Sequence, residues 1–276
     1  MGKGLLACLM ALSALAFEAQ APSQALAHDL PRVVSLDFCA DQYVLGLADR
    51  SQILAVSVQA GDAHSALRER AEGLPRIRDA AEDVLALKPD LIVRSYGGDA
   101  RAQAYYRSLG LEVFDLGYAS SIEGVEAMIA RAAQALGHPQ RGDAHIEALR
   151  VDLAQARSAG PTQSALYLTP SGATAGGGTL IDSWLVTAGF ENAGAERSGW
   201  VSLPLERLIE EGPDVILTAF FDGSAARDSW SPSRHPAFQT VLEASERIDL
   251  DGADMACASW RLGAAALQAR GLEETP

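Results

Sequence analysis

Two stretches of the chain repeat one pattern, and this repeat constrains the fold more than any other feature. EDVLALKPDLIV begins at Glu82 and ERLIEEGPDVIL begins at Glu206, and the same interval separates Pro89 from Pro213 without a gap. Each copy has an acidic residue, an amphipathic helical turn, a Pro-Asp pair and an aliphatic run typical of a buried parallel strand. A strand that leads through a small-residue loop into a helix precedes each copy. The repeat predicts two similar α/β lobes.

Chance similarity is the alternative explanation, because a helix followed by Pro-Asp and a strand is a common local structure. The matching order of the flanking elements favours two lobes. Along the whole chain, strand-like runs alternate with amphipathic helical stretches such as 41–48 and 100–109. The strand-like runs lie at 32–36, 53–56, 91–93, 112–115, 165–168, 215–218 and 247–250. This alternation predicts an α/β fold with parallel sheets.

The segment between the two repeats has a different pattern. Apolar residues at helical spacing indicate one helix that ends near Leu136, and the stretch after it predicts a second helix of roughly 30 Å. A helix of that length connects two lobes and allows them to open only modestly. The expected architecture is two Rossmann-like lobes joined by one long backbone helix. The expected divisions are a signal peptide at 1–27, an N-terminal lobe at 28–119, connecting helices at 120–160 and a C-terminal lobe at 161–276.

The N-terminal residues have the pattern of a secretory signal peptide. Lys3 precedes an apolar run at 5–17, and an Ala-x-Ala cleavage site ends at Ala27. The apolar run is too short to span a bilayer, which disfavours a membrane anchor. A lipoprotein signal at Cys8 is the other alternative, but Cys8 precedes nearly all of the apolar run. We expect an exported protein that does not insert into a membrane.

Charge and motifs argue against nucleic-acid binding and against catalysis. The formal net charge is −14, and only Lys88 remains as a lysine after cleavage at Ala27, whereas nucleic acid requires a basic face. The five histidines are scattered singly, and neither HExxH nor G-x-S-x-G occurs. SGATAGGGT, which begins at Ser171, lacks the Gly-Lys-Ser/Thr of a nucleotide-binding loop. We therefore expect a binding protein; a zinc- or manganese-ion binder, and then an exported hydrolase, remain the weaker alternatives.

Four further stretches carry a family resemblance. They are RVVSLDFCADQYVLGLADRSQILAVS, AEDVLALKPDLIV, SLGLEVFDL with SSIEGV, and GGGTLIDSWLVTAGFENAGAE with GWVSLPLERLIEEGPDVILT. In their order and spacing, they resemble the periplasmic substrate-binding proteins of ABC importers, helical-backbone class, which serve vitamin B12, ferric siderophores and heme. The resemblance covers nearly all of the mature chain, and the second lobe is most similar to the B12-binding branch.

The resemblance implies a periplasmic monomer that holds its ligand in a cleft between the lobes and delivers it to an ABC permease dimer. It implies no catalysis, no resident cofactor and no protein-bound metal. A corrinoid is the leading ligand, and a ferric siderophore or heme are the alternatives of the same class. The implied ligand-binding residues are Phe38, Cys39, Arg76, Tyr96, Tyr118, Ser171, Trp200, Phe221, Trp230, Cys257, Trp260 and Arg261.

Two of these residues have a more specific expected role. Trp200 stands six residues before Glu206, where the B12-binding branch places a pocket tryptophan, and Arg76 has the equivalent place in the first lobe. A flat macrocycle would stack on Trp200, and Arg76 would pair with an anionic group of the ligand. The resemblance also implies that Glu82 and Glu206 meet arginines of the permease. The alternative is that both are ordinary helix N-terminal acids stabilised by the helix dipole.

Cys39 and Cys257 are the two cysteines that remain after cleavage. Cysteines in an oxidising compartment most often pair. In the family layout each precedes a helix that faces the cleft from a different lobe, so a disulfide would tie the lobes together. Two thiols that ligate the metal of the ligand are a second possibility, because helix N-termini lower thiol pKa values. Inert buried thiols are the third.

Overall fold

The computed structural model describes residues 30–95, 100–202, 212–220 and 235–273. The expected signal peptide and four expected site residues, Tyr96, Glu206, Phe221 and Trp230, lie outside these ranges. Predictions that concern them stay predictions.

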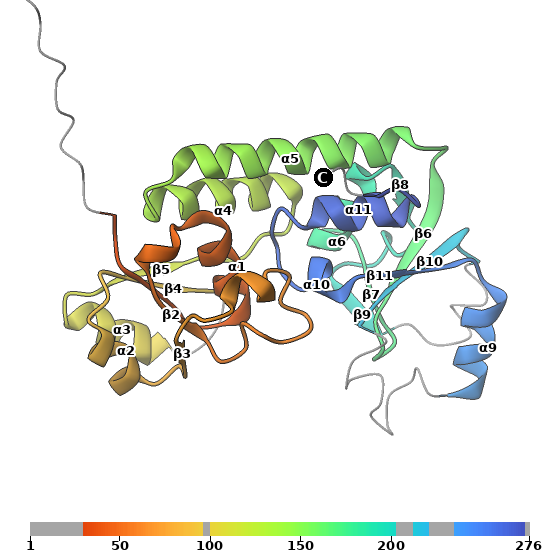
Figure 1. Ribbon diagram of the computed structural model, residues 1–276. Helices are drawn as coiled ribbons and strands as arrows, with labels where there is room; N and C mark the ends of the chain where they lie inside the picture. The colour runs from red at the N-terminus through yellow and green to blue at the C-terminus, as the bar shows by residue number, and fades with distance from the viewer. Residues whose placement is uncertain (1–29, 96–99, 203–211, 221–234, 274–276) are drawn as a thin grey trace, which may run out of the picture.

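The first half of the chain forms a five-stranded parallel sheet in the order β3-β2-β1-β4-β5. Its strands are β1 (Val33–Ser35), β2 (Ile53–Ser57), β3 (Arg76–Ile77), β4 (Leu91–Arg94) and β5 (Glu112–Asp115). Its helices are α1 (Phe38–Leu47), α2 (Ala81–Leu87) and α3 (Ala100–Ser108). Figure 1 shows α1 on one side of this sheet and α2 and α3 on the other. Both faces are covered, which explains why the strands read as aliphatic runs.

The alternation of side chains along the strands sorts them between the two faces. Val34 and Ile92 belong to a cluster with Val84 of α2 and Tyr106 of α3, whereas Val33 belongs to the main core together with residues of α1. Neighbouring residues of one strand point to opposite faces, so β1 contributes to both clusters. α1 follows β1 directly in the chain. It packs on the face of the sheet that carries Val33, and residues of the second half of the chain belong to the same core cluster.

The second half of the chain forms a mixed sheet in the order β11-β10-β6-β7-β9, with β8 paired to β6. Its strands are β6 (Gln163–Leu168), β7 (Ala173–Ala175), β8 (Phe190–Asn192), β9 (Trp200–Ser202), β10 (Val215–Ala219) and β11 (Arg247–Leu250). Its helices are α6 (Leu180–Thr187), α9 (Pro236–Ala244), α10 (Gly252–Met255) and α11 (Leu262–Ala269).

The prediction of an entirely parallel second sheet is wrong at one edge. β7 runs antiparallel to β6, and β9 runs antiparallel to β7. The reason is a tight turn after β6, where Gly172 adopts a positive φ of 75° and the Thr169 N–H donates to the Ala173 carbonyl at 2.9 Å. A crossover to a parallel strand needs a dozen or more residues, so this short turn returns the chain in the opposite direction.

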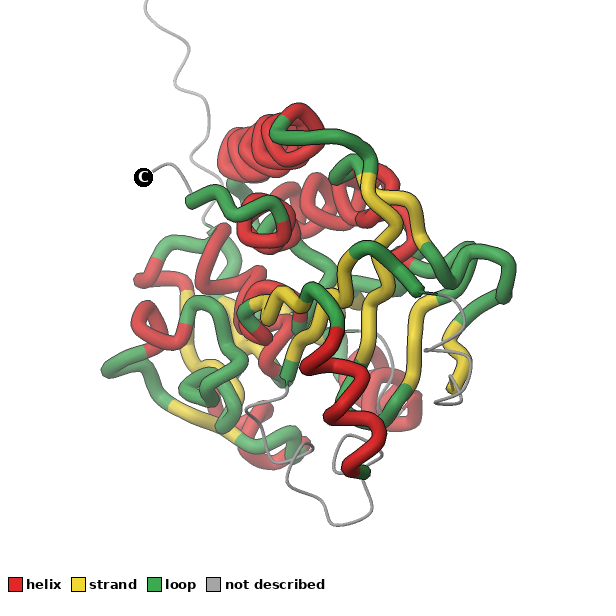
Figure 2. The backbone as a smooth tube through the Cα atoms, turned by 90° about the vertical axis from the view of Figure 1, so that its right-hand side faces the viewer, coloured by secondary structure: helices red, strands yellow, loops and turns green. Residues whose placement is uncertain are grey.

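Two packed helices connect the sheets. They are α4 (Ile122–Ala135), capped by the Ser121 hydroxyl, and the 20-residue α5 (Pro139–Ser158). Gly142 lets them approach closely, since a Cβ there would lie 2.5 Å from the Cβ of Ala133. α5 packs against α4 at one end and α11 at the other, so the predicted backbone helix is present (Figure 1). Seen nearly end-on in Figure 2, α5 forms the top of the molecule, above the strands.

None of the helices within the described ranges combines the length and the apolar character that a membrane crossing requires.

His145 links the backbone helix α5 to the C-terminal part of the chain. Its ring stacks on Trp260 with ring centroids 4.1 Å apart, and Trp260 in turn meets Tyr43 of α1 edge-on at 5.4 Å. Burial lowers the pKa of His145 below its usual value. Burial also lowers the pKa of His138, at the start of α5. The folded chain therefore disfavours the charged form of both imidazoles.

This arrangement predicts an acid-sensitive fold. Since the histidine pKa is lowered in the folded state, the unfolded chain binds protons more readily, and stability should fall as the pH drops below about 6.5. Urea unfolding at about pH 7 and about pH 5 measures the loss. His145→Gln should reduce this loss of stability between the two pH values. His138 should account for part of the loss that remains in the variant. His235→Gln, at an exposed position next to α9, is the control and should leave the loss unchanged. Equal pH dependence in wild type and His145→Gln would contradict this account.

Candidate ligand-binding cleft

A cavity of about 320 Å³ lies where the two halves of the chain meet. Its wall includes residues of α1, α4, α6, β9 and the loop after β5, and residues that follow α10 close it. The lining residues are Cys39, Tyr43, Ser95, Leu116, Gly117, Tyr118, Ala119, Met128, Leu180, Ile181, Trp200, Met255, Ala256, Cys257, Ala258 and Leu262. Within the described part of the chain, no residue of this lining is charged. The wall is apolar, as small-molecule sites commonly are.

Two aromatic side chains, one from each half of the chain, line the cavity but remain exposed. Tyr118 follows β5 and is 65% exposed, and Trp200 begins β9 and is 51% exposed. Trp200 contacts Tyr167 of β6 edge-on, with ring centroids 6.0 Å apart. Large aromatic residues usually bury most of their surface, so exposure next to a cavity favours a role in binding. The two rings come from different halves of the chain and border the same cavity.

The glycine-rich stretch before α6 positions Trp200. The Gly176 N–H donates to the Gly199 carbonyl at 2.8 Å, and a Cβ at Gly176 would overlap the carbonyl of Arg197. Only glycine lets the two backbones approach this closely. The Thr179 side chain then caps α6 by accepting from the Asp182 N–H at 3.1 Å. The stretch is therefore the support of the edge strand β9, which carries Trp200.

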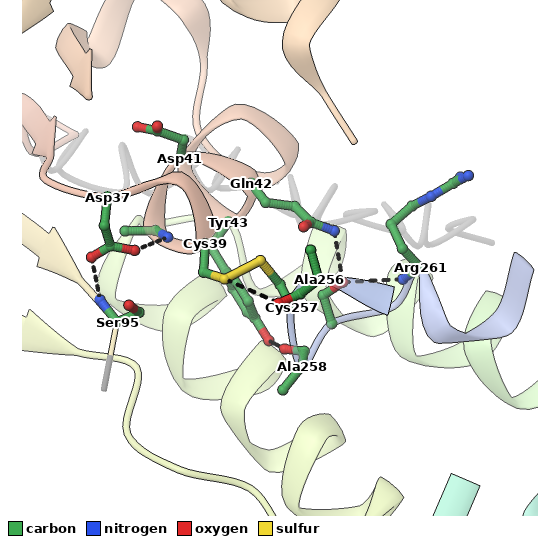
Figure 3. The surroundings of a disulfide bond; sticks show 12 residues. Asp37, Cys39, Asp41, Gln42, Tyr43, Ser95, Ala256, Cys257, Ala258 and Arg261 are labelled. Carbon is green, nitrogen blue, oxygen red and sulfur yellow. Dashed lines mark hydrogen bonds between the residues drawn. A yellow bond between two sulfur atoms is a disulfide. The ribbon is translucent and has the colours of Figure 1, made fainter. Parts of the chain in front are cut away.

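A disulfide between Cys39 and Cys257 forms one wall of the cavity (Figure 3). It joins the second residue of α1 to the segment after α10 across 218 positions of the chain, with the Cα atoms 5.6 Å apart. Of the three states considered for these cysteines, the paired one is present. Neither sulfur is available as a thiolate while the bond is intact.

Two hydrogen bonds accompany the disulfide. The Gln42 side-chain amide donates to the Ser259 hydroxyl at 2.6 Å, and the Tyr43 hydroxyl donates to the Ala258 carbonyl at 2.6 Å (Figure 3). Residues three and four positions after Cys39 lie on the same face of a helix, so one face of α1 makes all three contacts. Burial raises the pKa of Tyr43, which keeps its hydroxyl a donor. We call α1 residues 39, 42 and 43 with segment 256–259 the lobe clamp.

Two aspartates hold α1 in place on the first sheet. Asp37 caps α1 by accepting from the Ala40 N–H at 2.9 Å, and it also accepts from the Ser95 N–H at 2.8 Å at the end of β4. The buried Asp41 accepts from the Ser57 N–H at 2.9 Å and from the Ser57 hydroxyl at 2.5 Å. Burial raises the pKa of Asp41. The lobe clamp is therefore anchored to β2 and β4.

The structure brings together four of the expected ligand-binding residues and places five others outside the lining. Cys39, Tyr118, Trp200 and Cys257 line the cavity, whereas Phe38, Arg76, Ser171, Trp260 and Arg261 do not. Trp260 packs in the core against His145, and Arg261 forms an ion pair with Asp254 at 2.7 Å. The exposed Ser171 hydroxyl lies 2.9 Å from the Thr169 hydroxyl.

Arg76 and Trp200 each lie on an outermost strand of their sheet, β3 and β9, but only Trp200 lines the cavity. Arg76 lies on β3, the outer parallel strand of the first sheet, and its guanidinium donates to the Ser57 carbonyl at 3.3 Å. Trp200 lies on β9, the outer strand of the second sheet, which pairs antiparallel with β7. The two edge strands therefore match in their place in the strand order but differ in direction.

The sequence analysis did not single out Tyr43, Leu180, Ile181 and Met255 as lining residues, and it placed Met128 only on a helix face. Tyr43 had a usable signal, because it stands one helical turn after Cys39. Met255 stands two residues before Cys257. Glu82, expected to dock on a permease, is exposed in the first turn of α2.

Comparison with known proteins identifies a family. The family model described as periplasmic binding protein matches residues 33–228. An uncharacterized ABC transporter substrate-binding lipoprotein of Bacillus subtilis (strain 168) is 26% identical over 206 residues, which is 68% of this chain and 64% of that protein. A cobalamin-binding protein of Halobacterium salinarum is 30% identical over 197 residues, which is 68% of this chain and 53% of that protein. The matches thus span about half to two thirds of these relatives.

A solved structure agrees with the fold. The periplasmic heme-binding protein RhuT from Roseiflexus sp. RS-1, in its apo form, aligns with a TM-score of 0.67 and 24% identity, covering 87% of this chain and 96% of that chain. At this identity the likeness supports the two-lobed architecture with its connecting helix.

The lobe clamp predicts a large stability loss when its covalent bond is removed. Cys39→Ser with Cys257→Ser should lower the free energy of unfolding by about 2–5 kcal/mol, because the unfolded chain regains a long open loop. Either single serine variant should cost about as much as the pair, since each breaks the same bond. Urea unfolding measures the loss, and thiol titration confirms the redox state. A midpoint unchanged after verified reduction would show that the clamp does not depend on the disulfide.

Proposed function

The chain belongs to the periplasmic binding protein family, and we propose that it captures a corrinoid or a related metal chelate and delivers it to an ABC importer. The observation that carries the proposal is the cavity between the lobes, which the exposed Tyr118 and Trp200 line together with uncharged, mostly apolar residues. Such a site suits a flat ligand that stacks on aromatic rings. Capture and delivery require no catalysis, in keeping with a family of binding proteins.

The character of the wall supports a corrinoid over an anionic chelate. Recognition of catecholate or carboxylate groups usually uses arginine or lysine, and the described lining contains neither. The amide-rich edge of a corrinoid carries no such charge. Heme is the second candidate, provided that its propionates lie outside the apolar wall. A bare zinc or manganese ion is less well supported, because the described residues contain no cluster of His, Cys, Asp or Glu suited to hold it.

The size of the cavity indicates how a macrocycle would sit. A cavity of about 320 Å³ is at the lower end of the range of roughly 300–1,000 Å³ for small-molecule sites. A macrocycle therefore enters with one edge and extends past Tyr118 and Trp200 toward solvent. The lobe clamp and α5 hold the two walls close to their final separation. A preformed site of this kind loses little conformational entropy on binding.

Glu82 is the described half of the proposed docking surface for the permease. It stands in the first turn of α2, away from the cavity lining, and is exposed. A carboxylate there can meet a basic residue of a partner without disturbing the ligand. The equivalent role of Glu206 is proposed from the sequence repeat alone.

The proposal predicts that both aromatic residues contribute to affinity. Trp200→Ala and Tyr118→Ala should each weaken binding of cyanocobalamin by roughly tenfold or more, because buried aromatic anchors dominate such interfaces. Isothermal calorimetry measures the dissociation constants, with hemin and a ferric siderophore as parallel ligands. Trp260→Phe is the matched control: it alters a tryptophan behind the cavity and should leave affinity unchanged. Binding of none of the three ligands by the wild-type protein would refute the proposal.

Docking through Glu82 predicts a separate phenotype. Glu82→Arg should reduce ligand-dependent ATP hydrolysis by the reconstituted importer and leave the ligand dissociation constant unchanged, because a charge at the rim of an interface acts mainly on association. Glu147→Arg, at an exposed position of α5, makes the same change in net charge and should have no effect. Equal ATP hydrolysis with Glu82→Arg and wild type would exclude Glu82 from docking.

A further inference from the structure

Every sulfur-containing residue from position 28 onward lines the cavity between the lobes. The chain has three cysteines and four methionines, and Cys8, Met1 and Met10 lie in the expected signal peptide. The remaining four, Cys39, Met128, Met255 and Cys257, all belong to the lining. They come from α1, α4, α10 and the segment after α10. These four residues are far apart in the sequence, and the fold places all of them in the lining of one cavity.

The two methionines of the lining also belong to the main hydrophobic core. Met128 is 3% exposed and Met255 is 8% exposed, so both are buried in the cavity wall. Methionine commonly fills irregular gaps anywhere in a core. In this chain, however, the described core away from the cavity contains none and is built from valine, leucine, isoleucine, alanine and aromatic residues. Both thioether side chains of the described residues therefore belong to the cavity lining.

The chemistry of a thioether points to a particular kind of ligand. A methionine sulfur is a soft donor that binds soft or borderline transition metals and needs no deprotonation. It also serves as an axial ligand to iron in cytochromes. The cysteine sulfurs are consumed by the disulfide, so Met128 and Met255 are the sulfur donors that remain in the described wall. An uncharged donor also matches the uncharged lining.

We propose that a thioether of the Met128–Met255 pair coordinates the metal of the bound chelate. This inference rests on the proposed function and narrows its ligand class to complexes of soft or borderline metals with an exchangeable axial position. On binding, a metal–water bond breaks and a metal–sulfur bond forms, and no electron is transferred. A chelate whose metal is fully enclosed by oxygen donors cannot form this bond, so the thioether adds nothing to its affinity. The same holds for a corrinoid with both axial positions occupied.

Aquocobinamide and cyanocobalamin form a matched pair of probes. They share the corrin ring, but aquocobinamide has an exchangeable axial water, whereas both axial positions of cyanocobalamin are filled. We expect Met128→Leu or Met255→Leu to weaken aquocobinamide binding by roughly tenfold or more and to change cyanocobalamin binding by less than about twofold. Leucine conserves the volume of methionine, so the variants should fold. Ile181→Leu, elsewhere in the lining, is the control and should affect both ligands equally.

Selenomethionine labelling gives a direct readout of the proposed bond. In the exported protein, labelling places selenium at positions 128 and 255, the only methionines beyond the expected signal peptide. Selenium-edge absorption spectroscopy of the complex with aquocobinamide, or with hemin if that is the ligand bound, should show a selenium–metal shell. Tight binding without this shell, and with unchanged affinity in the double leucine variant, would overturn the inference and leave the proposed function intact. Failure to bind any chelate would overturn both.

Discussion

The disulfide between Cys39 and Cys257 is the contact on which the arrangement of the two lobes depends. It joins residues 218 positions apart, and one face of α1 adds the hydrogen bonds from Gln42 and Tyr43 to the same segment. Because α1 is itself anchored to the first sheet by Asp37 and Asp41, the bond connects one sheet to the C-terminal segment of the other lobe. The same bond forms a wall of the cavity, so the cross-link and the binding site are one structure.

The cavity contrasts with the rest of an acidic protein. The chain carries a formal net charge of −14, yet the described lining has no charged side chain. Among the described carboxylates, Glu82 lies on the exterior, and the buried Asp41 accepts two hydrogen bonds from Ser57. This separation leaves the cleft to aromatic, aliphatic and sulfur-containing groups. It provides stacking and dispersion where a ligand would lie, and keeps the charge needed for solubility outside.

Much of the fold was predictable, because it follows from local patterns. The period of apolar residues in 120–160 predicts α4 and α5, and the aliphatic runs predict β1, β4, β6 and β10. The antiparallel edge of the second sheet was missed, because it depends on a four-residue turn at Thr169–Gly172 that a search for helix–strand alternation passes over. The interval between the repeats gave Arg76 and Trp200 equivalent places, and both lie on edge strands, but Arg76 is not part of the cavity lining. Tyr118 and both cysteines, predicted from strand ends and helix starts, line the cavity, and so does Trp200, which the family resemblance singled out by its distance from Glu206.

The sequence by itself determined the class of the fold, the two lobes with their connecting helix and the aromatic and cysteine residues available to a site, because these follow from periodicity, length and residue type. Only the tertiary structure decided which of those residues meet. Met128 reads as a core position of a helix and Met255 as part of a short apolar segment, until the packing of α4 and α10 places both in one wall. Contacts between residues more than a hundred positions apart depend on how the lobes dock, and no local pattern specifies docking.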